Sequence, residues 1–172
     1  YHRPATVQEA LDQLGEFGDD AKVLAGGQSL VPLMALRLSR PGHIIDIGRL
    51  AELATIDEQE GTVRVGALVR HAAVEGSEAV RRSAPLVSDA MPHIGHRAIR
   101  NQGTSCGSLA HGDPAAELPA VSVALGAELV LRSAGAERVV PAGEFFTGYL
   151  TTSIEPDELL GEWRLPAMAP GT

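Results

Sequence analysis

The sequence predicts an α+β protein of two lobes, a small βα lobe over residues 1–50 and a larger lobe over residues 51–172. In the first lobe, segments with helical and strand-like apolar spacing alternate. In the second lobe, strand hairpins are separated by helices, and the sheet is expected to be mainly antiparallel. Apolar residues make up 44% of the chain and aromatic residues only 3%, so we expect a core built from Ala, Val, Leu and Ile.

The first lobe is predicted from four short elements. A helix is expected over residues 6–17, because Thr6 and Glu9 have capping-box spacing and Gly18 suits a helix end. The other three elements are a strand over 22–25, a helix over 28–38 and a strand over 43–47.

The second lobe begins with a hairpin, in which residues 53–56 and 62–65 flank a turn at Gly61. Short Ala-rich helices are expected within 70–92, followed by a loop over 95–108 that is rich in Gly, Arg, Asn and Ser. Further strands are expected over 128–132, 137–140 and 159–165.

A helix over residues 114–125 is predicted before the second hairpin. Asp113 and Pro114 suit its N-cap and first position, and Gly126 suits its end. Pro119 falls inside this range and is expected to kink the helix.

Charge and cysteine content exclude several classes of protein. The chain has 14 basic and 22 acidic residues and a net charge of −8, which is unfavourable for general nucleic-acid binding. Its one cysteine, Cys106, excludes an internal disulfide framework and any iron–sulfur or zinc site built from several thiolates of this chain. There is no apolar run long enough to span a membrane, and no apolar signal core follows Tyr1, so a cytoplasmic location is expected.

The first segment that could carry chemistry is the loop Ala25-Gly26-Gly27-Gln28-Ser29, expected between a strand and a helix. Glycines let backbone N–H groups approach a ligand closely, so the loop could cradle a phosphate or pyrophosphate. The other interpretation is a tight turn without a ligand. Because the chain contains neither a P-loop nor a G-x-G-x-x-G motif, an anion site here must use backbone N–H and hydroxyl groups.

The second such segment runs from Arg100 through Leu109 and leads into the predicted helix. Thr104 and Ser108 offer hydroxyl groups, and Gly107 offers an unobstructed N–H. Asp113 and Glu117 are expected one helical turn apart, where a carboxylate could accept hydrogen bonds from ribose or ribityl hydroxyls. Alternatively, Asp113 is only an N-cap and Glu117 is solvated.

Taken together, the two loops resemble those of the FAD-binding (medium) subunits of the molybdenum hydroxylase family, such as the carbon monoxide dehydrogenase medium subunit and the xanthine dehydrogenase FAD domain. The family motif A-G-G-x-S is matched by residues 25–29. The motif R-N-x-G-T-x-G-G-S-L-A-H-A-D-P-A-A-E-L-P is matched by residues 100–119, with Cys106 in place of a Gly and Gly112 in place of an Ala. Residues 145–149 and 157–160 are also similar to the family, and the resemblance extends over residues 1–166.

The resemblance implies a two-lobed FAD-binding domain of the vanillyl-alcohol-oxidase (PCMH-type) fold, with FAD between the lobes. It implies an electron-transfer subunit without catalytic residues or metal ligands of its own. Electrons would come from [2Fe–2S] clusters of a small partner chain, after oxidation of substrate on a large molybdenum-cofactor chain, and pass to NAD, quinone or another acceptor. The family continues into a further C-terminal domain beyond this point. The implied FAD contacts are Leu24, Ala25, Gly26, Gly27, Gln28, Ser29, Leu30, Ile94, Gly95, Thr104, Gly107, Ser108, Asp113, Glu117 and Leu160.

Two other functions stay open, a free-standing flavin oxidoreductase of the same fold and an assembly subunit that has lost FAD. A metal cluster of His93, His96, His111 and Asp113 is the alternative for this region, but it lacks a third ligand fixed by spacing. A nucleophilic Cys106 would need a base, and nothing fixes the geometry of the nearby His111. Arg97 and Arg100 are candidates for contacts with cofactor phosphate or a partner chain. Trp163 and Tyr149 are expected in the core, with a place beside the flavin as the alternative for Tyr149.

Overall fold

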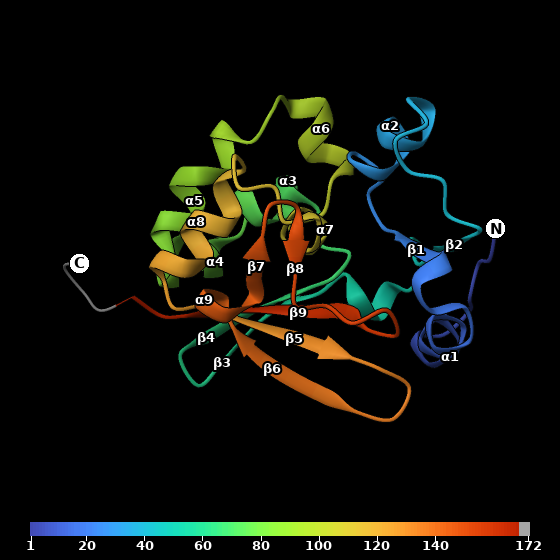
Figure 1. Cartoon of the computed structure of the whole chain (residues 1–172). Helices are drawn as coiled ribbons and strands as arrows, with labels where there is room; N and C mark the ends of the chain where they lie inside the picture. Colours follow the sequence, from blue (N-terminus) through green and yellow to red (C-terminus); the bar gives the residue numbers. More distant parts are fainter. Residues whose placement is uncertain (169–172) are drawn as a thin grey trace.

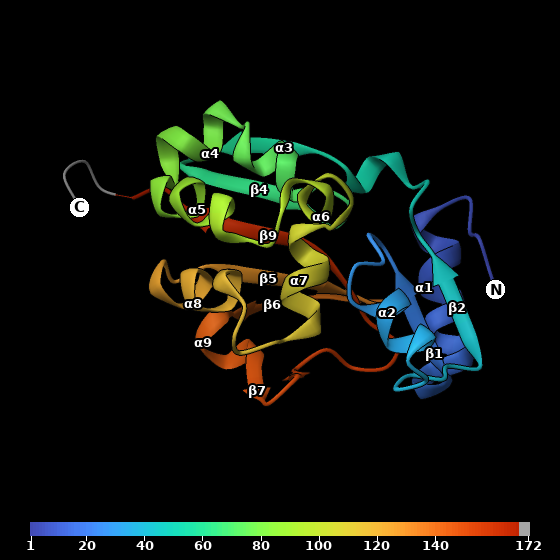
Figure 2. The same ribbon diagram turned by 90° about the horizontal axis from the view of Figure 1, so that it is seen from above.

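The computed structural model describes residues 1–168. A five-stranded antiparallel sheet has the order β3-β4-β9-β5-β6, with most helices packed over one of its faces (Figure 1). A small two-stranded parallel sheet lies at one end of the molecule (Figure 2). The large sheet comprises β3 (Ile56–Gln59), β4 (Thr62–Gly66), β5 (Glu128–Arg132), β6 (Glu137–Pro141) and β9 (Leu159–Pro166).

The small end contains α1 (Val7–Phe17), β1 (Ala21–Leu24), α2 (Leu30–Ala35) and β2 (His43–Asp46). Thr6 caps α1 as predicted, because its hydroxyl accepts the N–H of Glu9. The Glu9 carboxylate accepts the N–H of Ala5 instead of that of Thr6, so the capping box is shifted by one residue. β1 and β2 pair in parallel, and α2 is shorter than predicted because Arg37 adopts φ +60° just after it.

Short helices and one small hairpin complete the fold. They are α3 (His71–Glu75), α4 (Glu78–Ser83), α5 (Pro85–Ala90), α6 (Arg97–Gln102), α7 (Ser105–His111), α8 (Glu117–Ala124), α9 (Ala142–Phe145), β7 (Phe146–Gly148) and β8 (Thr151–Thr152). Within residues 1–168, no helix has the length and apolar composition that a membrane crossing requires.

The prediction of a loop over residues 95–108 is wrong, because α6 and α7 occupy most of it. Thr104 caps α7 by accepting the Gly107 N–H, and Gly112 ends α7 at φ +64°. The glycines and serines of this stretch are poor helix formers, but Cys106 and Leu109 bury their side chains in the core. Tertiary packing therefore overrides the local preference.

The helix predicted over 114–125 begins later, at Glu117, with Ala116 as its N-cap. Asp113 does not cap this helix, because its carboxylate accepts the N–H of Ala115 in a turn before it. Pro119 is the third residue of α8, where a backbone N–H has no partner within the helix. It therefore causes no kink, and that prediction is also wrong.

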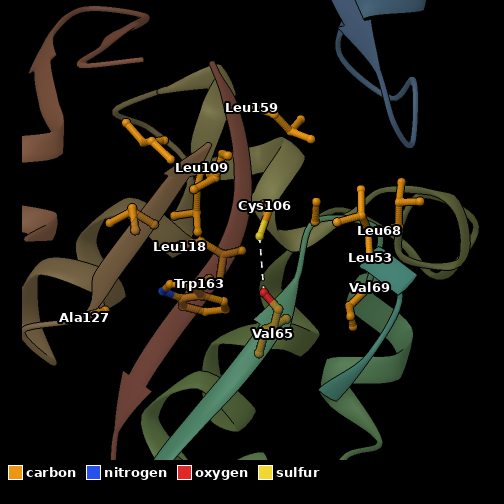
Figure 3. Close-up of a cluster of buried hydrophobic side chains, with 14 of the residues drawn as sticks. Leu53, Val65, Leu68, Val69, Cys106, Leu109, Leu118, Ala127, Leu159 and Trp163 are labelled. Atoms are coloured by element: carbon orange, nitrogen blue, oxygen red, sulfur yellow. Dashed lines mark hydrogen bonds between the residues drawn. The ribbon is translucent and has the colours of Figure 1, made fainter. Parts of the chain in front are cut away.

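One continuous hydrophobic core underlies the whole molecule. It extends from Leu11 of α1 and Ile45 of β2 to Trp163 and Leu165 of β9. Figure 3 shows Trp163 and Cys106 within it, and the Cys106 thiol donates to the carbonyl oxygen of Val65 at 3.6 Å. The core consists mostly of Ala, Val, Leu and Ile, as predicted. Trp163 is buried as expected, whereas Tyr149 is 78% exposed, so its prediction as a core residue is wrong.

Candidate cofactor-binding site

A cavity of about 680 Å³ separates the small parallel sheet from the helices and the large sheet. Its walls come from both glycine-rich loops, from residues 150–160, and from the end of α1. The volume is in the range of cavities that hold small-molecule ligands and cofactors. The two loops singled out in the sequence, about 75 residues apart, therefore line one site.

The first loop presents unpaired donors to this cavity. Within residues 1–168, the backbone N–H groups of Gly26, Gly27, Gln28 and Ser29 have no protein acceptor. Gly27 has φ +73°, a conformation that favours glycine. Consecutive N–H groups in such a loop form a concave site for an anion. The Ser29 hydroxyl caps no helix N–H and remains available.

The two loops touch backbone to backbone at Gly26. A Cβ added there would lie 2.5 Å from the carbonyl oxygen of Gln102 and 2.8 Å from Cα of Gly103. These distances are shorter than any ordinary van der Waals contact, and both atoms belong to the backbone. Only glycine fits at position 26 while the second loop keeps this place.

The second loop differs in detail from the prediction. Thr104 is buried and its hydroxyl oxygen accepts the Gly107 N–H at 3.1 Å, so only the hydroxyl proton is left to donate. The Gly107 N–H is accordingly not the free donor that the sequence predicts. The N–H of Thr104 has no protein acceptor within residues 1–168, and Ser108 lines the same cavity.

His71 packs against the second loop, lines the same cavity and was not anticipated from the sequence. It is 3% exposed, its backbone N–H donates to Gly103 at 3.0 Å, and its Nδ1 lies 3.2 Å from the buried Ser105 hydroxyl. Burial, assisted by the charge of Arg100, lowers the pKa of His71 to about 4, so the imidazole is neutral at neutral pH. A lone His in an apolar segment carries no spacing signal that could have revealed this role.

Residues 150–160 form the wall opposite the first loop. Ile154, Leu160 and, from the other side, Ile94 supply apolar surface. Glu158 anchors this wall, because both its carboxylate oxygens accept hydrogen bonds from Arg138 at 2.6 and 2.7 Å. Burial raises the pKa of Glu158, but the bonds from Arg138 and from the Glu155 N–H outweigh it and leave that pKa lowered.

Most of the predicted contact residues line the cavity, but some do not. Leu24, Gly95, Asp113 and Glu117 are absent from its walls. Asp113 sits in the turn before α8 and Glu117 at its first position, so they are not one turn apart on a helix. The residues that do line it are Ala25, Gly26, Gly27, Gln28, Ser29, Leu30, Ile94, Thr104, Gly107, Ser108 and Leu160.

The structure also shows the surroundings of the remaining candidate residues from the sequence analysis. Arg100 pairs with Glu75 at 2.9 Å and donates to the carbonyl groups of Pro92, Ile94 and Gly95, so it supports the fold and is not a free phosphate contact. Burial raises the pKa of Cys106, which keeps the thiol neutral. No group of three or more metal-ligating side chains is found among residues 1–168.

Charge is distributed unevenly around the cavity. All 22 carboxylates lie outside residues 21–45 and 90–112, the two segments that carry the glycine loops. Lys22, Arg37, Arg40 and Arg97 lie inside them and form no ion pair within residues 1–168. The cavity walls do include the carboxylates Asp19, Glu155 and Glu158, but none of them belongs to the two glycine loops.

Comparison with known proteins shows the family of the chain. The family model described as "FAD binding domain in molybdopterin dehydrogenase" matches residues 1–168. The chain is 44% identical to the carbon monoxide dehydrogenase medium chain of Hydrogenophaga pseudoflava, covering 100% of this chain and 60% of that protein. It is 45% identical to caffeine dehydrogenase subunit beta of a Pseudomonas species, covering 96% of this chain and 57% of that protein.

Solved structures of similar proteins have the same fold as this chain. Carbon monoxide dehydrogenase from Hydrogenophaga pseudoflava superposes with a TM-score of 0.96 at 44% identity, over 99% of this chain and 60% of that chain. Quinoline 2-oxidoreductase from Pseudomonas putida gives 0.94 at 38% identity, over 98% of this chain and 59% of that chain. The chain therefore spans somewhat under two thirds of the length of these relatives. On this evidence the chain belongs to the family of FAD-binding domains of molybdopterin dehydrogenases.

Proposed function

We propose that this chain binds FAD in the cavity between the two glycine-rich loops. The observation that carries the proposal is the row of unpaired N–H groups from Gly26 to Ser29, held against the second loop by the backbone contact at Gly26. A pyrophosphate is the part of FAD that needs such donors. The hydroxyls of Ser29 and Ser108 would add to them, and the apolar wall at Ile94, Ile154 and Leu160 suits the flavin ring.

The bound FAD would supply the redox chemistry, and the chain would act as the electron-transfer subunit of a molybdenum hydroxylase complex. Its own residues bind and orient the cofactor and exclude water from it. The molybdenum cofactor and the [2Fe–2S] clusters belong, in this proposal, to companion chains, which agrees with the single cysteine here. The acceptor would be NAD, quinone or another oxidant, and the complex would be cytoplasmic.

The same proposal keeps the boundary of the lobes near residue 50, with FAD between them. It also leaves the choice of substrate to a companion chain. Similar chains are named after carbon monoxide and caffeine, although they match this chain at 44% and 45% identity. Such different substrates would not be selected by a cofactor-binding domain of nearly constant fold.

The first test is the visible absorption spectrum of the purified full-length subunit, with the released cofactor identified by chromatography. Flavin bands and released FAD are expected. Gly27→Ala should lower FAD affinity by about tenfold or more. The substitution strains a backbone at φ +73° and places a Cβ 3.2 Å from Val31 inside the cradle.

The matched control is Gly61→Ala. Gly61 has φ +75° but nothing within 4 Å of an added Cβ, so this variant carries the same backbone strain away from the cavity. It should keep its flavin. A colourless subunit that takes up no added FAD would favour the assembly subunit instead.

A further inference from the structure

The imidazole of His71 has a fixed place in the wall of the cavity. His71 is the first residue of α3, which lies beside α6 (Figure 2), and its N–H donates to the Gly103 carbonyl at 3.0 Å. The N–H of Ser105 donates in turn to the Val69 carbonyl at 3.1 Å, so the chain around His71 is tied to the second glycine loop at two points. Only 3% of His71 is exposed, and the residue lines the cavity.

The surroundings of the ring decide which of its nitrogens carries the proton. The Ser105 hydroxyl lies 3.2 Å from Nδ1 and has no other hydrogen-bond partner within residues 1–168. Because Ser105 is fully buried, its hydroxyl proton needs an acceptor, and Nδ1 is the acceptor in reach. Burial keeps the pKa of His71 at about 4, so the neutral ring carries its one proton on Nε2.

This Nε2–H group has no acceptor in the part of the chain that the structure describes. Nε2 is also not one of the fully buried side-chain atoms that lack a partner, so the atom is open to the cavity that His71 lines. Donors as enclosed as this one are normally paired in folded proteins. The missing acceptor therefore belongs to the molecule that occupies the cavity.

The ring lies one residue away from the first glycine loop. A Cβ added to Gly103 would lie 3.0 Å from Cδ2 and 3.3 Å from Nε2 of His71. A Cβ added to Gly26 would lie 2.8 Å from Cα of the same Gly103. Gly103 thus separates the ring from the start of the row of backbone donors, and a phosphate held by that row would bring an oxygen acceptor to this part of the cavity.

We propose that the Nε2–H group of His71 donates a hydrogen bond to a diphosphate oxygen of FAD, which makes His71 a cofactor-binding residue. The inference rests on the proposed function, because it assigns the acceptor to the cofactor proposed for this cavity. The bond adds a side-chain donor from the second loop to the backbone donors of the first. Arg100 does not take this role, since it is held by Glu75.

Two amide substitutions separate the roles of the two ring nitrogens. His71→Gln places an amide N–H near the position of Nε2, whereas His71→Asn places its amide near Nδ1 and leaves no donor toward the cavity. In the purified full-length subunit, His71→Asn should weaken FAD binding about tenfold or more, and His71→Gln should weaken it by about threefold or less. The exposed His93→Asn is the control and should leave FAD binding unchanged.

The opposite order would overturn the proposal. If His71 only supported the second loop, His71→Asn would keep the bond to Ser105 and would bind FAD more tightly than His71→Gln. Denaturant unfolding of each variant without FAD identifies any that merely folds poorly.

Ser105→Ala tests the same distinction from the other side of the ring. It removes the partner of Nδ1 but leaves Nε2 in place, so FAD affinity should fall less than in His71→Asn. A greater loss of FAD affinity in Ser105→Ala than in His71→Asn would show that support of the loop accounts for the effect, and would overturn the proposal.

Phosphorus NMR of bound FAD locates the contact on the cofactor. His71→Asn should shift the diphosphate resonances and leave the visible flavin bands unchanged. Shifted flavin bands with unchanged diphosphate resonances would overturn the contact with phosphate.

The unaltered subunit separates failure of this inference from failure of the proposed function. If it holds no FAD and takes up none, the proposed function is wrong. If it binds FAD and His71→Asn binds FAD equally tightly, only the role of His71 is wrong.

Discussion

A single buried imidazole supports the second glycine loop. His71 binds the loop through its backbone N–H to Gly103 and through its ring to Ser105, the first residue of α7. The Cδ2 and Nε2 atoms of the ring also fill the space beside Gly103, where an added Cβ would lie 3.0 and 3.3 Å from them. The loop is thus held by contacts from His71, which itself lines the cavity.

The pKa of His71 makes this support sensitive to acid. Its value of about 4 lies below the ordinary 6.5, so between these pH values the unfolded chain binds more protons than the folded chain. The free energy of unfolding should therefore fall as pH drops from about 6.5 to about 4, by an amount on the order of 2–3 kcal/mol. His71→Gln should flatten this dependence in denaturant titrations at several pH values, whereas the exposed His96→Gln should not.

At this scale, prediction from sequence depends on how local the signal is. Ala25–Ser29 and Ser108 could be placed at the site because their motifs fix neighbouring backbone groups. Asp113 and Glu117 could not, because their geometry depends on where α8 begins. His71 gave no signal, since its role comes from a partner 34 residues away in sequence.

At the scale of elements, the cap of α7 joins stability to the site. Thr104→Ala removes the acceptor of the Gly107 N–H and should cost about 1 kcal/mol of unfolding free energy. It should also weaken FAD binding, because the loop and the start of α7 lose their fixed position, and Thr104→Ser should restore both. Thr6→Ala removes the equivalent cap of α1 and should lower stability alone. Equal losses of FAD affinity in both Ala variants would contradict this role.

The ion pair between Arg138 of β6 and Glu158 of the cavity wall also couples stability to the site. Arg138→Gln removes both bonds to Glu158 and should raise the dissociation constant for FAD several-fold by releasing residues 153–158, with a stability loss of about 1 kcal/mol. Arg132→Gln breaks a single bond to Glu137 on the same sheet and is the control. FAD titrations followed by flavin fluorescence measure the dissociation constants of the two variants. Equal FAD affinities would refute a role of the Arg138–Glu158 ion pair in binding.

Strands and amphipathic helices were predictable because their apolar spacing is periodic. The strand pairs around Gly61 and Gly135 and the helix capped by Thr6 are examples. Helices α6 and α7 were not, because Gly, Asn and Ser indicate a loop when read locally. Their helical conformation depends on buried contacts, such as those of Cys106 and Leu109, that only the assembled sheet provides.

At the scale of the whole molecule, the shared core predicts cooperative unfolding. The two lobes expected from sequence are not separate cores, because Leu11 and Ile45 belong to the same cluster as Trp163. Denaturant unfolding should therefore show one transition by fluorescence and circular dichroism alike. Saturating FAD should shift this transition to higher denaturant concentration. At a free FAD concentration of about a hundred times the dissociation constant, the free energy of unfolding should rise by about 2.7 kcal/mol. Separate unfolding transitions for the two lobes would contradict unfolding as one cooperative unit.

The continuous core also bears on how the cofactor is acquired. The two sides of the cavity are joined by buried side chains, so they cannot swing apart on a hinge without exposing them. We expect the folded subunit to take up FAD and, once it is bound, to exchange it only slowly with free FAD. The cell's supply of flavin-loaded subunit would then follow the synthesis and turnover of the chain, and not the momentary concentration of free FAD.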